Sequence, residues 1–120
     1  MYVQGFLIPV PEGNRDKYIE VARFMSDIMA KFGATEIVEA WEEDVKDGKW
    51  TDFRQAVKAE DGEKIVFSWV VWPDKTTADA AHEKMMQDDR MQGDFTPPFD
   101  GKRMIWGGFA PVFTMGRSES

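Results

Sequence analysis

The segment KIVFSWVVW, residues 64–72, is the feature that most constrains how this chain can fold. Side chains of a strand alternate between the two faces of its sheet. One face of this segment therefore carries only apolar side chains, namely Ile65, Phe67, Trp69 and Val71, and the other is interrupted within the run only by Ser68. Because an antiparallel sheet usually leaves one face to water, a strand that is apolar on both faces needs cover on both.

Other segments supply helices and further strands around this one. Apolar residues recur at spacings of three and four, which predicts helices at 15–32 and 75–90. Asn14 and Gly33 are residue types typical of the start and the end of a helix. Apolar or alternating runs bounded by Gly, Pro and Asp predict strands at 2–10, 35–44, 64–72 and 103–113, with a short extra strand at 52–59.

This order of elements predicts an α+β domain. Without the extra short strand it is the ferredoxin-like βαββαβ order, an antiparallel sheet with two helices on one face. We expect a single ferredoxin-like domain over 1–114 and a disordered polar tail over 115–120. Two helices leave one sheet face open, so we expect a homodimer that packs sheet against sheet as a dimeric α+β barrel. The alternative is that C-terminal segments or long loops fold over that face.

Charge and missing residue types narrow the classes of function. The net charge of −7, from 15 basic and 22 acidic residues, disfavours nucleic acid as a partner, because nucleic acid binds to surfaces that replace its counterions. The chain has no cysteine and one histidine, His82, which we expect to be packed in the apolar stripe of the second helix. We expect no metal site and, without a nucleotide-binding motif, no cofactor. No apolar run approaches the ~20 residues that span a bilayer, so we expect a cytoplasmic protein without a membrane partner.

Three runs of residues resemble a known family. They are TDFRQAVKAEDGEKIVFSWVVWPDK, KMMQDDRM and PPFDGKRMIWGGF, and they are similar to the YbaA-like family of small bacterial proteins, a conserved domain of unknown function. The resemblance covers nearly the whole chain, to about residue 113. It implies the dimeric α+β barrel fold and implies no established activity. The family often has Pro where Asp89 stands, which bears only on where the second helix ends.

Glu39 is the candidate catalytic residue. It lies between Ile37 and Trp41 on one face of the predicted strand 35–44, expected to be the face turned away from the helices. Arg54, on the neighbouring predicted strand, could reach it. A carboxylate between apolar neighbours either pairs with a cation or has a raised pKa, and a raised pKa suits a general base. A structural Glu39–Arg54 pair that holds the strand register is the alternative interpretation.

The FDGKRM segment is a second candidate site. Asp100, Lys102 and Arg103 follow a proline-rich loop and precede an aromatic strand, an arrangement that suits an anionic small molecule. The alternative is a turn at Asp100 with the two cations paired to nearby acids. Further candidate ligand contacts inside the barrel are Trp41, Ser68, Trp69 and Trp106, which could equally be core or interface residues.

Three functions fit these features. The first is a homodimeric binding module whose barrel holds a small, partly apolar molecule, either neutral or anionic, with Glu39, Arg54 and Arg103 as its polar contacts. The second, by analogy of fold alone, is a cofactor-independent enzyme of the monooxygenase kind that uses Glu39 as its base. The third is a structural or protein-interaction module with a filled interior. The sequence identifies neither a ligand nor a reaction.

Overall fold

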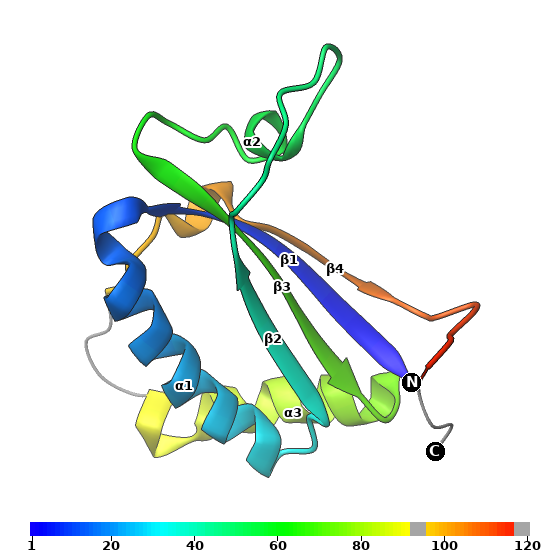
Figure 1. Ribbon diagram of the computed structural model, residues 1–120. Coiled ribbons are helices and arrows are strands. Elements are labelled where there is room, and N and C mark those ends of the chain that lie inside the picture. The colour runs from blue at the N-terminus through cyan, green and yellow to red at the C-terminus, as the bar shows by residue number, and fades with distance from the viewer. Residues whose placement is uncertain (92–95, 117–120) are drawn as a thin grey trace.

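The computed structural model describes residues 1–91 and 96–116, and it shows a mixed α+β domain (Figure 1). One four-stranded antiparallel sheet has the strand order β2-β3-β1-β4. Its strands are β1 (Tyr2–Pro11), β2 (Glu36–Trp41), β3 (Glu63–Trp72) and β4 (Ile105–Phe109). The helices are α1 (Arg15–Lys31), α2 (Phe53–Ala56) and α3 (Lys75–Gln87), with 3-10 turns at Glu12–Asn14, Asp89–Met91 and Gly101–Arg103.

The two central strands, β1 and β3, form the backbone of the sheet. They pair along all ten residues of each strand, from Tyr2 opposite Trp72 to Pro11 opposite Glu63. The shorter strands β2 and β4 are the edges, and they pair with β3 and β1 respectively. The long predicted strand 64–72 is therefore central, and residues on both its faces are buried.

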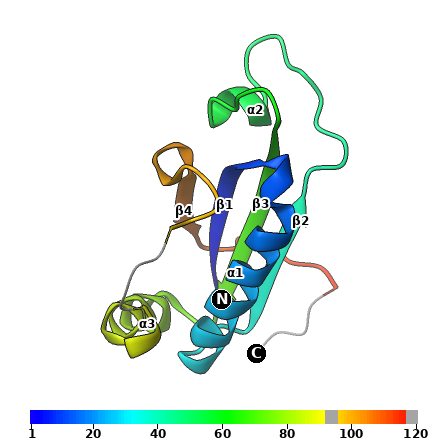
Figure 2. The same ribbon diagram turned by 90° about the vertical axis from the view of Figure 1, so that its left-hand side faces the viewer.

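Both long helices pack on the same face of the sheet, which we call the helix face (Figure 2). Even-numbered residues of β1 and β3 point to it and form two adjoining core clusters with the helices. The buried members of these clusters are Ile8, Val10, Tyr18 and Val66, and Val70, Trp72, Ala78 and Ala81. The helix face thus holds most of the core, because two amphipathic helices bury their apolar stripes there.

The end of α1 depends on a glycine, as the sequence predicts. Gly33 follows the helix with a φ of +116°, a backbone conformation that residues with a Cβ rarely adopt. A Cβ at this position would also come within 2.7 Å of Cγ2 of Thr77 on α3. The missing side chain therefore lets α1 end where α3 passes close by.

The prediction of a strand at 52–59 is wrong. The segment forms the short helix α2, because Asp52 accepts hydrogen bonds from the backbone N–H groups of Gln55 and Gly48 at 2.7 and 2.9 Å and caps its start. Phe53, Ala56 and Val57 also follow helical spacing, and Val57 is buried.

Two further expectations need correction, and a third falls in part outside the described residues. His82 is exposed on α3, because Ala78 and Ala81 make the inward stripe and His82 lies beside it. The predicted last strand, 103–113, is confirmed only over Ile105–Phe109. Of the predicted tail, residues 117–120 lie outside the described residues. None of the helices in the described ranges is long and apolar enough to cross a membrane.

Candidate functional site

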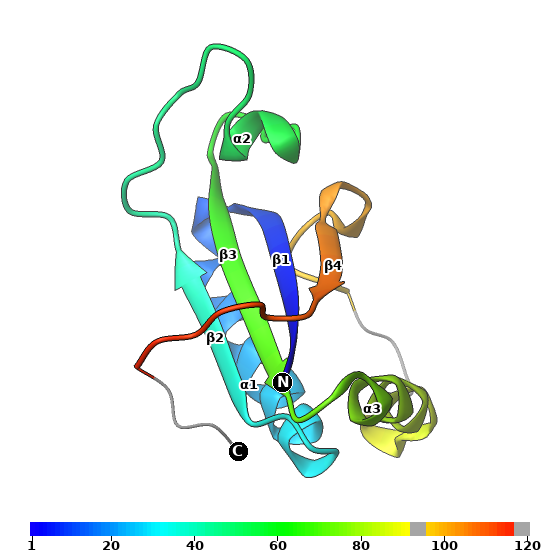
Figure 3. The same cartoon turned by 90° about the vertical axis from the view of Figure 1, so that its right-hand side faces the viewer.

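The opposite face of the sheet, which we call the open face, is turned toward the viewer in Figure 3 and carries exposed apolar side chains. Odd-numbered residues of β1 and β3 point to it, so the predicted apolar row of the central strand lies here. The register places Val3, Gly5, Leu7, Ile65, Phe67, Trp69, Val71, Ile105, Gly107 and Phe109 on this face. Phe67, Ile105 and Phe109 remain exposed, so within the described residues neither helix nor loop covers them fully.

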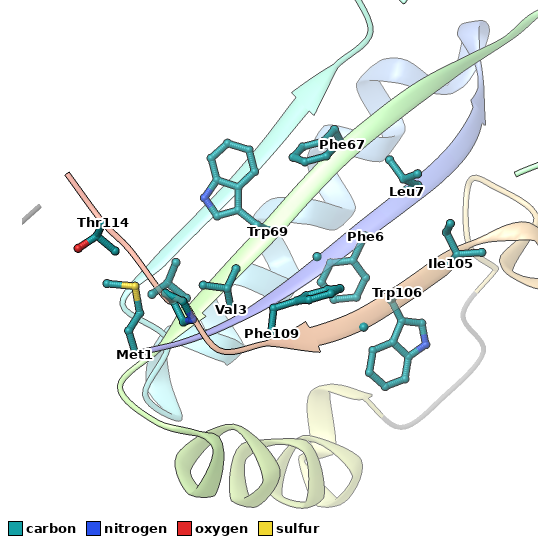
Figure 4. Close-up of a pocket in the computed structure, with 14 residues that line it drawn as sticks. Met1, Val3, Phe6, Leu7, Phe67, Trp69, Ile105, Trp106, Phe109 and Thr114 are labelled. Atoms are coloured by element: carbon teal, nitrogen blue, oxygen red, sulfur yellow. The ribbon is translucent and has the colours of Figure 1, made fainter. Parts of the chain in front are cut away.

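A groove of about 680 Å³ runs along the open face (Figure 4). Its lining comes from three strands, the N-terminus and the segment after β4. The residues are Met1, Val3, Gly5, Phe6, Leu7, Phe67, Trp69, Val71, Ile105, Trp106, Gly107, Phe109, Pro111 and Thr114. None of these side chains is charged. The groove is therefore suited to an apolar occupant rather than to an ion.

Two glycines form the floor of the groove. Gly5 of β1 lies directly opposite Gly107 of β4, and both positions face the groove. A Cβ at Gly5 would lie 3.8 Å from Cε2 of Phe109, and a Cβ at Gly107 would lie 3.3 Å from Cζ of the same ring. The bare backbone thus lets the Phe109 ring lie low across the sheet, as Figure 4 shows.

A row of aromatic rings continues from the groove toward α2. The Phe67 ring contacts the Trp69 ring edge to face at a centroid distance of 5.7 Å, and Phe53 of α2 contacts Phe67 at 6.0 Å. The Trp69 indole Nε1 donates a hydrogen bond of 2.8 Å to the Glu36 carboxylate, which satisfies the one polar atom of that ring. A second hollow of about 510 Å³ beneath the loop before α2 shares Phe67 with the groove.

The segment after β4 crosses one end of the open face (Figure 3). Pro111 and Thr114 of this segment line the groove, and Thr114 lies on the same side of it as Met1 (Figure 4). From the sequence, one alternative was that the C-terminal segment folds over the open face. The structure shows this at one end of the face only. The exposed side chains of Phe67 and Ile105 show that the cover stops short of the other end.

Glu39 lies on the helix face, and the expectation that it faces away from the helices is wrong. The register places Glu39 opposite Ser68, whose side chain shares a face with the buried Val66 and Val70. Ile37 and Trp41 on the same side of β2 pack against the two core clusters. The strand alternation was predicted correctly, but the helices cover the side on which Glu39 lies.

The Glu39 carboxylate is held from α1. Tyr18 is buried, and its hydroxyl donates a hydrogen bond of 2.6 Å to Oε1 of Glu39. Partial burial raises the pKa of Glu39, and hydrogen bonds from Tyr18 and Ser68 oppose that rise. Burial and the neighbouring carboxylate raise the pKa of the Tyr18 hydroxyl well above its ordinary value, so it stays a donor. The pair joins α1 to the edge strand β2.

Arg54 does not reach Glu39, because it lies on α2 rather than on a neighbouring strand. Its guanidinium donates to Oε1 of Glu42 at 3.3 Å and to the Glu63 and Glu60 carbonyls at 2.8 and 3.1 Å. The expected Glu39–Arg54 pair is replaced by a pair with Glu42, whose Oε1 also accepts from the backbone N–H of Ile65 at 2.8 Å. Arg54 thereby anchors α2 to the start of β3.

Arg103 is engaged by protein groups on three sides. Nη1 and Nη2 each donate to one oxygen of the buried Glu63 at 2.7 Å, and Nε donates to Asp100 at 3.0 Å. The Lys58 carbonyl accepts a further bond of 2.9 Å from Nη1. The Arg103 hydrogen bonds hold the pKa of Glu63 below its ordinary value. This geometry agrees with the alternative of a paired turn, while Lys102 lies exposed on the same turn.

The predicted site residues therefore lie in three separate places. Trp69 is on the open face and Trp106 borders its groove, although the Trp106 ring stacks on Phe6 from the helix side at 6.4 Å. Glu39, Trp41 and Ser68 are on the helix face, and Arg54, Asp100, Lys102 and Arg103 are at the end of the sheet. Within the described residues, no group of three or more His, Cys, Asp or Glu side chains is arranged to hold a metal ion.

The sequence did not predict the glycine floor of the groove or the Phe109 ring that lies on it. Gly107 and Gly108 were visible beside Trp106, but the partner glycine, Gly5, becomes relevant only through the β1–β4 register. The available signal was the alternation of β4, in which Ile105, Gly107 and Phe109 share one side.

Comparison with known proteins supports the resemblance seen in the sequence. Residues 1–101 match the family described as "Protein of unknown function (DUF1428)". The "Uncharacterized protein YbaA" of Escherichia coli K12 is 52% identical over 113 residues, which cover 92% of this chain and 96% of that protein. The protein of the same description from Shigella flexneri shows the same identity and coverage. These descriptions carry no activity that could be tested on the site.

Proposed function

From the premise that this chain belongs to the DUF1428 family of unknown function, we propose that it works as a homodimeric binding module. In this proposal two ferredoxin-like domains pack open face to open face, as a dimeric α+β barrel. The chamber between the two sheets holds a small, uncharged, apolar molecule. The observation that carries the proposal is the uncharged groove on an exposed apolar sheet face.

The sheet topology supports the ferredoxin-like assignment. The strand order β2-β3-β1-β4, with every neighbouring pair antiparallel, is the order that two interleaved βαβ units produce. The excursion that contains α2 lies between β2 and β3, so it lengthens one hairpin connection and leaves the order of the main elements unchanged.

The exposed area of the chain supports the second copy. The protein exposes 8519 Å², whereas a compact monomer of 13.8 kDa exposes about 6,600 Å². The difference is about 1,900 Å² per chain, to which exposed side chains outside the sheet, among them Trp50, Val112 and Phe113, also contribute. Obligate homodimers bury about 2,000–5,000 Å² in total over both subunits, so covering the open face would account for an excess of this size. An exposed apolar sheet face is also a typical protein-interaction surface.

The chemistry of the groove defines the class of ligand. A volume of about 680 Å³ lies within the range of about 300–1,000 Å³ found for small-molecule sites. The aromatic walls, Phe67, Trp69 and Phe109, favour a flat or branched hydrocarbon surface. Arg103, the cation considered for an anionic ligand, is committed to Glu63 and Asp100. We therefore propose a neutral ligand.

The enzyme hypothesis is less well supported by this geometry. It requires Glu39 to act as a base inside an aromatic cavity. Glu39 lies on the helix face, while the groove lies on the open face, so the sheet separates the proposed base from the proposed cavity. A base acts only within hydrogen-bond reach of the proton that it removes.

Light scattering combined with native mass spectrometry tests the dimer. We expect the wild-type protein to have twice the chain mass at micromolar concentration, and Phe67→Glu to have the mass of one chain, because it places a charge in the centre of the open face. Phe24→Glu is the matched control, since Phe24 is a comparably exposed phenylalanine on α1, on the other side of the sheet. A monomeric wild-type protein, or equal behaviour of the two variants, would contradict the proposal.

Binding of a neutral apolar fluorophore, N-phenyl-1-naphthylamine, tests the chamber separately. We expect its fluorescence to rise when wild-type dimer is added and to stay low with the monomeric Phe67→Glu protein. A stable dimer that leaves the fluorophore unchanged and carries no extra mass would mean a filled interior. That outcome would overturn the ligand and favour a structural or protein-interaction module.

A further inference from the structure

We infer that residues 110–116 form an arm that is shared between protomers, so that the arm of each chain completes the groove of its partner. This inference rests on the proposed homodimer and names what the second copy contributes to the site. It follows from the course of the arm, from its outward apolar side chains and from the part of the open face that the arm leaves uncovered.

The arm leaves the sheet directly after β4. Phe109 is the last residue of that strand, and Pro111 has no backbone N–H with which to continue a ladder. The chain then crosses the end of the open face that lies near the N-terminus, as Figure 3 shows. Pro111 and Thr114 point inward and line the groove of their own protomer.

The outward side of the arm is apolar and almost fully exposed. Val112, Phe113 and Met115 are 100%, 82% and 86% exposed. Three large apolar side chains within four residues would be expected to meet another surface, because monomeric proteins rarely leave such a group in water. Since the inward side of the arm already contacts its own groove, the outward side faces the position of a second sheet.

The far end of the open face supplies a complementary surface. Leu7 pairs with Ile105 at the end of the groove opposite the arm, and Phe67 lies beside Leu7 in the β1–β3 register. Phe67 and Ile105 remain exposed there. A two-fold axis that reverses the strand direction of the partner would place its arm over this far end. Each face would then be covered by its own arm at one end and by the partner's arm at the other.

This arrangement predicts a specific contact between chains. The outward side chain of Phe113 in one protomer would lie near Leu7 in the other. Within one chain the arm starts far from Leu7, because Phe109 pairs with Val3 while Leu7 pairs with Ile105, four residues or about 13 Å along the sheet. A disulfide requires Cα atoms within about 7 Å of each other, so we expect a 7–113 disulfide to form between chains, which a gel distinguishes by mass from one within a chain.

Cysteine cross-linking tests the arm, and the chain has no cysteine of its own to interfere. We expect the double variant Leu7→Cys/Phe113→Cys to form a covalent dimer under mild oxidation, visible on a non-reducing gel. Leu7→Cys/Met86→Cys is the matched control, because Met86 is exposed on α3, on the other side of the sheet, and it should remain uncross-linked. A non-covalent dimer without the 7–113 cross-link would overturn the shared arm and leave the homodimer standing. A monomer would overturn both.

A second pair of variants tests the arm without new cysteines. Met115→Glu should raise the dissociation constant of the dimer by at least about tenfold, as expected for loss of a buried interface residue. Met86→Glu makes the same chemical change on α3 and should leave that constant unchanged. Equal dissociation constants for both variants and the wild type would mean that the arm lies outside the interface.

Discussion

Replacement of Glu63 by glutamine is the sharpest test of how the end of the sheet is held together. Glu63 is 8% exposed, and each of its oxygens accepts a hydrogen bond of 2.7 Å from the Arg103 guanidinium. Oε1 also accepts from the backbone N–H of Glu60 at 2.7 Å. Glutamine keeps the shape of the side chain, but it removes the negative charge and turns one N–H donor toward the guanidinium.

The expected loss can be worked out from the partners that remain. Breaking a buried ion pair costs about 3–5 kcal/mol, because one charge is left without compensation. Arg103 retains Asp100 and the Lys58 carbonyl, and its side chain is 18% exposed, so water can reach it. We therefore expect Glu63→Gln to lower the free energy of unfolding by about 2–3 kcal/mol at pH 7. With a urea dependence of about 1.5 kcal/mol/M, the midpoint should fall by about 1.3–2 M.

The loss should depend on pH in a defined direction. Arg103 lowers the pKa of Glu63 in the folded protein, so folding is favoured by the ionised carboxylate. The stabilisation is complete above the unfolded pKa of about 4.3 and is lost as the pH falls through the lower, folded value. Wild type and Glu63→Gln should therefore differ fully at pH 7 and converge in acid.

Urea unfolding followed by tryptophan fluorescence measures this difference. Asp79→Asn is the control, because it removes an exposed pair with Lys75 and should leave the midpoint unchanged. Equal midpoints for Glu63→Gln and wild type at pH 7 would refute the reasoning. Arg103 would then be weakly held by Glu63, and the anionic-ligand role considered for the FDGKR segment would regain support.

Two further predictions concern α1. Because the pKa of Glu39 is raised, mainly by burial, the folded state favours the protonated acid and loses stability as the pH rises above about 4.3. Glu39→Gln should remove that loss. In thermal unfolding, the melting temperature of the variant minus that of the wild type should therefore increase from pH 4 to pH 7. A difference that does not change with pH would contradict the raised pKa. Gly33→Ala should lower the melting temperature, because it combines a positive φ with a clash at Thr77. Gly13→Ala is the control, since a Cβ at Gly13 meets open space and should leave the melting temperature unchanged. Equal melting temperatures of the two variants would contradict the close approach of α1 and α3.

The long elements were predictable from local sequence patterns: apolar residues at spacings of three and four mark the helix at 15–32, and a continuous apolar run bounded by turn residues marks the strand at 64–72. The strand at 64–72 and the helix at 15–32 are both found with nearly the predicted bounds. The segment 52–59 was misassigned because it is too short for its pattern to separate a strand from one helical turn. The N-cap at Asp52, a local hydrogen-bonding feature, decides its structure.

The predicted Glu39 environment shows what alternation leaves open. The pattern of 35–44 correctly placed Ile37, Glu39 and Trp41 on one face. It could not tell which face the helices would cover, since that depends on the direction in which the chain crosses from β1 to β2 and on the β2–β3 register. A Tyr18–Glu39 contact likewise joins residues that only the packed helix brings together.

The separation of charge from the groove explains why neighbouring residues in the sequence do not form one site. Arg103 and Trp106 are three positions apart, which suggested a cation beside an aromatic wall. In the fold, Arg103 turns to Glu63 at the end of the sheet, while β4 carries Ile105 and Phe109 onto the open face. Because the Glu63 carboxylate already pairs with the Arg103 guanidinium, an anionic ligand would have to displace Glu63 before it could bind Arg103. An uncharged groove, separate from a neutralised arginine at the end of the sheet, is therefore the arrangement expected for an apolar ligand or an apolar partner surface, and not for an anion.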